Sequence, residues 1–343
     1  MSEGKALPLV SVIIPHYGGE EIIQECLKSL KNSNYTHLEI IVVDNSSTDD
    51  SVKTMKDRFP HVTLIQSEYN RGFAGGCNFG AQHAMGEYLL ILNNDTIHES
   101  GWIKHLVQRM ESDRKISSVQ PKINNYKKRD YFDYAGGSGG FMDKYCFPFA
   151  RGRVFNTIEK DEGQYDDSCR VFWASGTAFL TKRNIFEQIG GFDETLFAHM
   201  EEIDYHWKCQ LLGYEVWIEP KSVVYHHGAL TLPKSSPQKT YLNYRNSLIL
   251  LLTNYNAIKS LKLFFPRFSM EILSLIKEIL IFRWRHALAI VRAWLWIIFH
   301  LSFLYQRRRS LKKTHQVDNI YRKSIAARYY LMGKKTYVEL IDG

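Results

Sequence analysis

The fold of this 343-residue chain is decided by the stretch LLILNNDTIHES, which runs from Leu89 to Ser100. Four aliphatic residues end abruptly in two asparagines, an aspartate and a threonine. A short apolar run bounded by polar residues predicts a buried β-strand. Ligands of open α/β sheets usually bind at the carboxyl ends of such strands, so Asp95 is a candidate ligand-facing carboxylate that could hold a metal. Asn and Asp are equally typical of turns, and the strand alone does not separate the two interpretations.

The segments around this stretch alternate between strand and helix patterns. Apolar, β-branched runs occur at LVSVIIP (9–15), LEIIVVD (38–44) and VTLIQSE (62–68). Helical patterns separate them at EEIIQECLKSL (20–30) and STDDSVKTMKDRF (47–59). Strands separated by helices imply right-handed crossovers, so we expect an α/β fold with a mostly parallel central sheet and a Rossmann-like, nucleotide-binding architecture. Fold alone does not give function.

The distribution of charge indicates two parts with different tasks. Residues 241–343 contain 18 Lys and Arg against 5 Asp and Glu, a formal charge of +13, so the first 240 residues carry −5 of the total of +8. We therefore expect an α/β domain at 1–240 and a basic, amphipathic helical region at 241–343, with a boundary signal in KSSPQ at Lys234–Gln238. Two hydrophobic helices are predicted beyond it, roughly Leu248–Phe265 and Leu273–Tyr305.

The cysteines and the amino terminus bear on the compartment. The five cysteines lie far apart without a CxxC pair, which argues against a structural zinc site or a disulfide framework and favours a reducing compartment. The first residues, MSEGKALPLVSVIIP, contain one lysine and no long apolar run before Pro15. They are not typical of a secretory signal and are predicted to lead into the first strand of a cytosolic domain.

Polar or glycine-rich segments follow several predicted strands. Asp44 ends one strand in VVDNSSTDDS (42–51) and could accept hydrogen bonds from a base or ribose, although the same residues can form an Asx turn or a helix cap. The segment NRGFAGGCNFG (70–80) would let a bulky anion approach the backbone, with Arg71 as a guanidinium donor. Its glycine spacing fits neither GxGxxG nor GxxxxGK[ST], so neither a Rossmann dinucleotide site nor a P-loop is supported.

A second cluster, GGFDETLFAHMEEIDYHWKCQLLGY (190–214), combines an apolar helical stripe with crowded acids. Glu201, Glu202 and Asp204 lie in the first turn of this helix, where carboxylates interact favourably with the helix dipole. That structural role does not account for three acids flanked by two histidines. Neighbouring carboxylates raise one another's pKa, which suits a general base.

Taken in order, these segments resemble glycosyltransferase family 2, the inverting enzymes with the GT-A fold, from about Val10 to about Asn246. The opening VSVIIPHYGGEEIIQECLKSL is similar to the family's first strand and helix, and VVDNSSTDDS to its nucleotide-binding segment. NRGFAGGCNFG is similar to the version in rhamnosyltransferase-like members. LLILNNDT stands at the place of the DxD motif, WASGTAFLTKRNIFEQIGGFDE at that of the acceptor-side segment, MEEID at that of the base motif, and VVYHHG at that of a late metal-site histidine.

The resemblance implies a sugar-nucleotide donor site in residues 1–240, the catalytic domain. The implied donor-binding residues are Pro15, Tyr17, Asp44, Asn70, Arg71, Gly72, Asn93, Asn94 and Asp95. Asp95 and His226 would hold Mg²⁺ or Mn²⁺ on the donor diphosphate, since hard oxygen ligands suit these ions. The first acid of DxD is replaced by Asn93. Trp173, Ser175 and Gly176 would line the acceptor or sugar pocket.

The resemblance also implies an inverting mechanism. An acceptor hydroxyl would attack the anomeric carbon in line as the diphosphate leaves. Glu202 stands where the family places its base, with Glu for Asp, and Glu201 is the alternate. Asp204, nearest the apolar stripe, is expected to have a positioning role.

The basic tail contains ALAIVRAWLWIIFHLSFLY (287–305), which approaches the length that spans a bilayer. Burying its Arg292 in lipid would cost about 2.5 kcal/mol or more. We therefore expect amphipathic helices that lie on the membrane, with Arg307–Arg309, Lys312 and Lys313 on anionic headgroups. A helical bundle packed on the catalytic domain is the alternative. The expected location is cytoplasmic and peripheral, at the inner face of the cell membrane.

The expected function is the metal-dependent, inverting transfer of a sugar to a hydroxyl of a lipid-linked or growing surface polysaccharide. The resemblance favours L-rhamnose from dTDP-rhamnose, and a UDP-hexose or another donor is the alternative. A non-catalytic sugar-nucleotide-binding scaffold subunit is the third hypothesis, and Asn93 is its support. Nucleic acid is not an expected partner, because the basic tail also contains long apolar helices.

Overall fold

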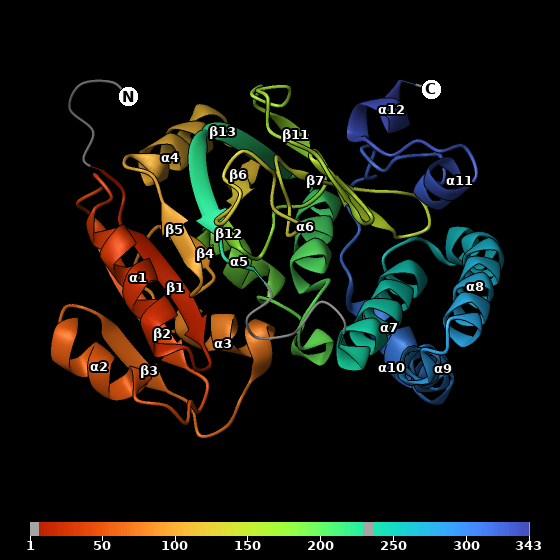
Figure 1. Ribbon diagram of the computed structural model, residues 1–343, viewed down its shortest axis with the longest axis horizontal. Helices are drawn as coiled ribbons and strands as arrows, with labels where there is room; N and C mark the ends of the chain where they lie inside the picture. Colours follow the sequence, from red (N-terminus) through yellow and green to blue (C-terminus); the bar gives the residue numbers. More distant parts are fainter. Residues whose placement is uncertain (1–6, 229–235, 343) are drawn as a thin grey trace.

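A single twisted sheet of nine strands forms the centre of the molecule, as the computed structural model shows for residues 7–228 and 236–342 (Figure 1). The order along the sheet is β11-β13-β6-β12-β4-β1-β2-β3, and β5 pairs with β13. The strands are β1 (Val10–His16), β2 (Leu38–Asp44), β3 (Thr63–Gln66), β4 (Tyr88–Leu92), β5 (Thr96–His98), β6 (Ile116–Asn125), β11 (Cys169–Val171), β12 (Ala178–Lys182) and β13 (Glu215–His226). Only β5, β11 and β12 run against the other six. The prediction of an α/β fold with a mostly parallel sheet is therefore confirmed.

Helices cover both faces of this sheet and give the fold three layers. The buried side chains of α1 (Glu20–Lys31) and α4 (Trp102–Ser112) pack on one face, together with Met55 of α2 (Ser51–Arg58). Those of α3 (Gly72–Ala81), α5 (Arg183–Ile189) and α6 (Glu201–Leu211) pack on the other. The predicted strands at the start of the chain all form; the runs of β1, β2 and β4 are largely buried between these helix layers, whereas β3 is a more exposed edge strand.

The glycine-rich segment after β3 is a helix and does not form the anion-binding loop that its composition suggested. In α3 the glycines let the helix lie close against β1 and β2. A Cβ on Gly80 would lie 2.6 Å from Cγ2 of Ile13, and a Cβ on Gly76 would lie 3.0 Å from Cβ of Pro15. These two glycines therefore allow close helix–sheet packing. A glycine-rich sequence is equally compatible with a phosphate-binding loop, so the sequence alone did not distinguish the two.

A second, smaller sheet stands beside the first and carries the carboxyl-terminal segment. Its order is β10-β9-β8-β7, formed by β7 (Gly140–Met142), β8 (Pro148–Ala150), β9 (Arg153–Val154) and β10 (Thr157–Ile158). The short helices α11 (Ile325–Tyr330) and α12 (Tyr337–Ile341) pack against it (Figure 1). Val154 of β9 shares a buried cluster with Ile325 of α11 and Leu340 of α12, so these two helices pack against β9.

The tail forms four long helices where two were predicted. They are α7 (Pro237–Thr253), α8 (Ala257–Leu280), α9 (Trp284–Phe299) and α10 (Leu301–Ser310). The side chain of Asn256 caps α8 by accepting a hydrogen bond from the backbone N–H of Lys259, at 2.8 Å. Phe282, with a left-handed φ of 57°, follows the end of α8. The expected helices were wrong because capping residues interrupt an apolar pattern that continues across them.

These helices share one hydrophobic core with the α/β part. One buried cluster contains Trp207 of α6, Leu248 of α7, and Trp173, which follows β11. The expected boundary after residue 240 falls inside α7, and Lys234 of the predicted boundary signal lies outside the described residues. The α/β part with the central sheet and the helical tail are therefore packed together along α7.

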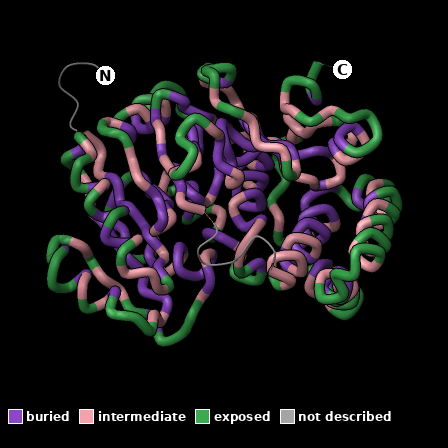
Figure 2. The backbone as a smooth tube through the Cα atoms, in the orientation of Figure 1, coloured by how far each residue is buried: buried purple, intermediate pink, exposed green. Residues whose placement is uncertain are grey.

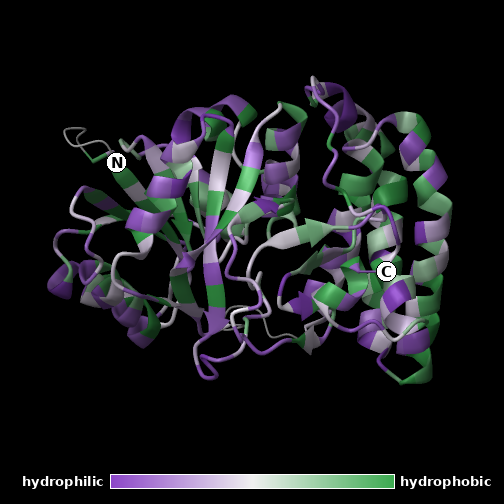
Figure 3. Cartoon of the chain, turned by 90° about the horizontal axis from the view of Figure 1, so that it is seen from above, coloured by the Kyte–Doolittle hydropathy of each residue, from purple (hydrophilic) through white to green (hydrophobic). Residues whose placement is uncertain are grey.

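The outer surfaces of the tail helices remain apolar and exposed (Figures 2 and 3). Phe282 is 78% exposed and Phe299 is 77% exposed. Within the described residues, no helix taken alone has both the length and the apolar composition to cross a membrane. The pair α9 and α10 meets those two criteria only jointly, and it is bent by 70° at its junction.

The tail cations are placed differently from the expectation of a basic row on headgroups. Arg307 is buried and pairs with Asp193 and Asp204. Arg308 and Lys313 donate hydrogen bonds to backbone carbonyls of the α7 end and the loop after it. Carboxylates and backbone carbonyls bind these three cations, although Lys313 remains exposed, as do Arg309 and Lys312.

Candidate active site

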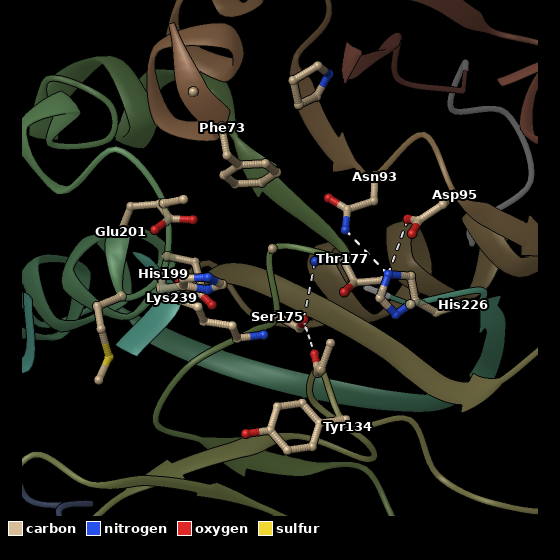
Figure 4. A pocket seen from close by; sticks show the side chains of 18 of the residues that line it. Phe73, Asn93, Asp95, Tyr134, Ser175, Thr177, His199, Glu201, His226 and Lys239 are labelled. Atoms are coloured by element: carbon tan, nitrogen blue, oxygen red, sulfur yellow. Dashed lines mark hydrogen bonds and ion pairs between the residues drawn. The ribbon is translucent and has the colours of Figure 1, made fainter. Parts of the chain in front are cut away.

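A cavity of about 510 Å³ opens at the carboxyl-terminal edge of the central sheet (Figure 4). The register pairs His16 of β1 with Asp44 of β2, and β4 ends close by at Leu92, so the polar residues after these strands meet at one edge. The start of α6 and the loop before it form the opposite wall. A large concave site at the end of parallel strands is where α/β proteins bind ligands.

The first polar group in this cavity is formed by Asp95, His226 and Asp133. The pairing of β5 with β13 sets Thr96 opposite His226, which brings the imidazole against Asp95. Nε2 of His226 lies 3.1 Å from Oδ1 of Asp95, and Nδ1 lies 2.8 Å from Oδ1 of Asp133. Burial alone would lower the pKa of His226, but the two carboxylates overcome this effect and raise it to about 10. The same imidazole holds the pKa of Asp95 and of Asp133 below the usual range, against the effect of burial.

This arrangement fits a divalent cation. When Nε2 of His226 is deprotonated and Nδ1 donates to Asp133, Nε2 and Oδ1 of Asp95 are two neighbouring acceptors that a divalent cation could bind in place of the proton. Their separation of 3.1 Å matches two adjacent ligands of an octahedral ion, about 3 Å apart. A carboxylate with an imidazole suits Mn²⁺ better than Mg²⁺. Within residues 7–228 and 236–342, no group of three or more His, Cys, Asp and Glu side chains could hold a metal, so other ligands would have to come from a bound molecule.

Asp133 lies outside every predicted site segment, and the geometry gives it a positioning role. We expect Asp133→Asn to weaken Mn²⁺ binding by roughly 10- to 100-fold, because the charged acceptor that orients the imidazole of His226 is lost. Calorimetric titration with Mn²⁺ measures this effect. Asp167→Asn, which changes an exposed carboxylate paired with Arg151, is the matched control. Equal Mn²⁺ affinity of Asp133→Asn and the wild type would contradict the role.

Most of the predicted donor residues line the cavity. Pro15, Tyr17, Asn70, Gly72, Asn93, Asn94 and Asp95 are all part of its wall. Nδ2 of Asn93 lies 3.5 Å from Nε2 of His226 and points toward it (Figure 4), while Nδ2 of Asn94 lies 2.9 Å from Nδ1 of His16. The asparagine that replaces the first acid therefore still faces the carboxylate–histidine pair.

Two predicted donor residues lie outside the wall of the cavity. Asp44 is buried and its Oδ1 accepts a hydrogen bond from the backbone N–H of Ser47 at 3.1 Å, which is the Asx-turn alternative. Arg71 donates to Oγ of Ser67 at 2.9 Å and stacks on the rings of Tyr69 and Phe79. Because the glycine-rich segment is helical, Arg71 is directed to the surface side of α3 and away from the cavity.

Glu201 and Glu202 form a second polar group at the other end of the cavity from Asp95. One carboxylate oxygen of each, Oε2, is buried without a hydrogen-bond partner among the described residues. Burial raises the pKa of Glu202 to about 7. Burial and the neighbouring Glu202 raise the pKa of Glu201 well above its usual value. Two adjacent carboxyls that resist ionisation near neutral pH are suited to accept a proton.

A strained loop presents these acids, and α7 holds the loop in place. Phe197, His199 and Met200 have φ values of 62°, 66° and 75°, which side chains rarely adopt. Nδ2 of Asn246 lies 2.7 Å from the carbonyl of His199, and it also donates to two neighbouring carbonyls of the loop. Arg245 donates to the carbonyl of Thr195 at 2.7 Å. Residues of the tail therefore fix the position of Glu201 and Glu202.

Asp204 does not line the cavity. It lies on the buried side of α6, where its carboxylate pairs with Nζ of Lys208 at 2.7 Å and with Arg307 at 2.6 Å. Burial would raise the pKa of Asp204, but Arg307 and Lys208 lower it far below the usual range. The ion network anchors α6 to α10, so any part of Asp204 in the chemistry is indirect.

The predicted acceptor residues lie in the wall between the two polar groups. Trp173, Ser175 and Gly176 all line the cavity. Nε1 of Trp173 donates to the carbonyl of Phe141 at 2.9 Å, and the backbone N–H of Ser175 donates to Gln120 at 2.7 Å. A Cβ on Gly176 would lie 3.1 Å from the ring of Phe73, so glycine keeps this ring close to the wall.

Several lining residues were missed by the sequence analysis. They include His16, Asn45, Asp133, Tyr134, Arg153, Lys239 and Asn243. His16 directly follows Pro15 and could have been suspected from its place at the end of β1. Arg153 and Lys239 come from segments without periodicity or a motif, and no local signal marks them.

The fold and the cavity define the class of the protein as GT-A. A family model for glycosyl transferase family 2 matches residues 11–190, just over half of the chain. The chain belongs to glycosyl transferase family 2.

Relatives agree with this assignment, and a solved structure agrees with the fold. An uncharacterized glycosyltransferase of Haemophilus influenzae is 32% identical over 115 residues, which are 33% of this chain and 36% of that protein. An N-acetylglucosaminyl-diphospho-decaprenol L-rhamnosyltransferase of Mycobacterium tuberculosis is 23% identical over 71% of this chain and 83% of its own length. The structure of GalNAc-T7 with UDP, GalNAc and Mn²⁺ matches 71% of this chain and 48% of its own, with a TM-score of 0.57 and 19% identity. The chain thus spans only about a third of the first relative.

Proposed function

We propose that the chain transfers a sugar, with inversion, from a nucleoside diphosphate sugar to a hydroxyl of an acceptor. The observation that carries the proposal is one cavity with a carboxylate–histidine pair at one end and two unpaired buried carboxyls at the other (Figure 4). Membership of glycosyl transferase family 2 supports it. In the proposed reaction, a cation would lie near the leaving group and a base near the attacking group.

Each residue has a distinct part in the proposed reaction. A divalent cation, when bound by Asp95 and His226, neutralises the diphosphate that leaves. Trp173 and Ser175 hold the sugar and the acceptor against the wall. The acceptor oxygen forms its bond to the anomeric carbon as the bond from that carbon to the diphosphate oxygen breaks, and Glu202 takes the hydroxyl proton.

We propose dTDP-L-rhamnose as the donor. The glycine-rich segment at residues 70–80 is similar to that of rhamnosyltransferase-like members, and the Mycobacterium tuberculosis relative, of which the chain covers 83%, is named an L-rhamnosyltransferase. A UDP-sugar is the second candidate, because GalNAc-T7, which shares the fold, was crystallised with UDP.

Binding of nucleotides tests the proposal. We expect dTDP to bind more tightly than UDP and GDP in the presence of Mn²⁺, and we expect Asp95→Ala to lose at least tenfold in affinity, because the oxygen ligand facing His226 is removed. Calorimetry with each nucleotide, with and without Mn²⁺, measures both effects, and Asp167→Ala is the control. Preferred binding of UDP would replace the donor. Nucleotide binding without any turnover of sugar nucleotides would favour a non-catalytic scaffold, and no binding by a folded sample would refute the transferase.

We further propose that the acceptor is linked to a lipid and that the tail helices lie on an anionic membrane at the cytoplasmic face. The exposed apolar side chains of α8–α10 support this placement. They include Ile258, Leu261, Phe265, Leu273, Leu280, Phe282, Trp284, Leu288 and Phe299. Exposed Arg283 and Arg285 lie beside Phe282 and Trp284, so apolar and basic side chains occur on the same turn.

Flotation with lipid vesicles tests this surface. We expect wild-type protein to float with vesicles that contain phosphatidylglycerol, and we expect Phe282→Ser with Trp284→Ser to reduce the floated fraction severalfold, because two exposed anchors are lost. Leu331→Ser, at an exposed apolar residue outside these helices, is the control. The membrane placement is wrong if the double variant floats as the wild type does, or if the wild type does not float.

A further inference from the structure

Arg153 is a buried cation that lines the cavity without an ion-pair partner among the described residues. Its residue is only 7% exposed, it lines the cavity, and its Nε has no hydrogen-bond partner. No carboxylate within the described chain lies at ion-pair distance from it; its one ring contact is with Tyr134, at 4.8 Å from the guanidinium carbon to the ring centroid. A buried guanidinium is costly unless an anion compensates it.

A second cation approaches the same ring from another element. Nζ of Lys239, at the start of α7, lies 5.6 Å from the centroid of Tyr134. Figure 4 shows Lys239 on the side of Glu201 and His199, with Asp95 and His226 across the cavity. Arg153 and Lys239 therefore approach one aromatic ring in the wall of the cavity, and the charge of Arg153 also acts on Glu202, the proposed base.

We propose that Arg153 and Lys239 form a binding site for a phosphate or diphosphate group of the acceptor. The inference rests on the proposed function and adds a charged group to the acceptor. Two cations match the charge of a diphosphate, and the planar guanidinium can donate two parallel hydrogen bonds to its oxygens.

The position of the site assigns its phosphate to the acceptor and not to the donor. The donor diphosphate belongs with Asp95 and His226, which lie at the other end of the cavity. Lys239 lies in the first turn of α7, next to Thr240, whose Oγ1 is 2.7 Å from Nδ1 of His286 on α9, and the exposed Phe282 lies just before α9. An acceptor whose diphosphate lies between Arg153 and Lys239 could extend its lipid chain toward these helices while its sugar reaches Glu202.

The alternative is that Arg153 acts only on Glu202. Its charge lowers the pKa of this carboxyl, although burial has the larger, opposite effect. Such a role requires no ligand. It would shift the pH dependence of the reaction in an arginine variant and leave phosphate binding unchanged, so the two roles can be separated.

Pyrophosphate binding to metal-free protein is the first test. Without a cation, Asp95 repels phosphates, so bound pyrophosphate reports the Arg153 site. We expect binding by the wild type, a loss of at least tenfold in affinity in Arg153→Gln, and a loss of less than twofold in Arg151→Gln. Arg151 is the matched control, because it lies two residues away and pairs with Asp167. No binding by the wild type, or equal binding by Arg153→Gln, overturns the proposal, whatever the outcome for nucleotides.

Kinetics assigns the phosphate to the acceptor or to the donor. With a farnesyl-diphosphate-linked sugar as acceptor, Arg153→Gln is expected to raise the acceptor KM at least tenfold, and more than the KM of the sugar nucleotide. An alkyl glycoside of the same sugar, which has no phosphate, should show a smaller change in KM. A larger rise in the donor KM, or a shift of the pH profile alone, overturns the assignment. Failure of the wild type to bind any nucleotide refutes the proposed function instead, and the pyrophosphate result stands apart from it.

Discussion

Replacing Glu202 by glutamine is expected to lower kcat by about 10²- to 10⁴-fold, with a much smaller change in nucleotide affinity. The amide keeps the size of the side chain but cannot take a proton from the acceptor hydroxyl. Oε2 of Glu202 is buried in the wall of the cavity and has no hydrogen-bond partner among the described residues, so this oxygen is available to the acceptor hydroxyl. Turnover of the sugar nucleotide with saturating acceptor measures the effect.

Glu201→Gln is the matched comparison for this prediction. Glu201 is adjacent, also lines the cavity and also has an unpaired Oε2, so it differs from Glu202 mainly in its position on the first turn of α6. We expect its replacement to cost less in kcat. If Glu201→Gln is the more damaging change, the two residues exchange roles and Glu201 is the base.

The pH dependence of kcat follows from the same side chain. Burial raises the pKa of Glu202 to about 7, so the ionised form that accepts a proton predominates only above this pH. We expect kcat of the wild type to fall as the pH drops through about 7, and not through the usual carboxylate range near 4. A profile that stays flat down to pH 5 would contradict this assignment.

The parts of the fold that could be predicted are those set by local patterns. The runs that end at Pro15, Asp44 and Leu92 became parallel strands, because each is mostly apolar and most of its residues are buried. The glycine-rich segment at 70–80 was expected to let an anion approach its backbone, and it forms a helix instead. Glycine disfavours an isolated helix, but here its small size allows contact of the helix with β1 and β2. That benefit exists only in the assembled fold.

The site divides in the same way. Asp95 and the acidic pair at the start of α6 were found because a strand end and a helix start concentrate them in short segments. Asp133 and Arg153 were not found, because they reach the cavity from a long segment without periodicity, and only the tertiary fold brings them there. The prediction for the tail was wrong at Arg307. It was expected at the surface on lipid headgroups, whereas the structure buries it in ion pairs with Asp193 and Asp204.

Replacing Arg307 by methionine is expected to lower the free energy of unfolding by about 3–5 kcal/mol, because the buried Asp204 and the partly buried Asp193 lose their shared cation. The guanidinium contacts Asp204 at 2.6 Å and Asp193 at 2.8 Å. Arg309→Met, an exposed arginine on the same helix, is the control and should change stability little. Denaturant unfolding at neutral pH, followed by tryptophan fluorescence, measures both variants.

Acid should reveal which carboxylate is responsible. The pKa of Asp204 in the folded protein is depressed by Arg307 and Lys208 against the effect of burial, so this ion pair contributes stability above the unfolded pKa of about 4 and loses it as the pH falls toward the folded value. The difference between wild type and Arg307→Met should therefore be full at pH 7 and shrink below about pH 4. A difference that does not depend on pH would assign the loss to packing of the arginine stem instead of to charge. If Arg307→Met is as stable as Arg309→Met, α10 docks without the ion network, and apolar contacts in the shared core hold the tail against α6. If it is strongly destabilised, the tail helices are part of the catalytic fold, and any membrane role must be tested by surface substitutions and not by truncation.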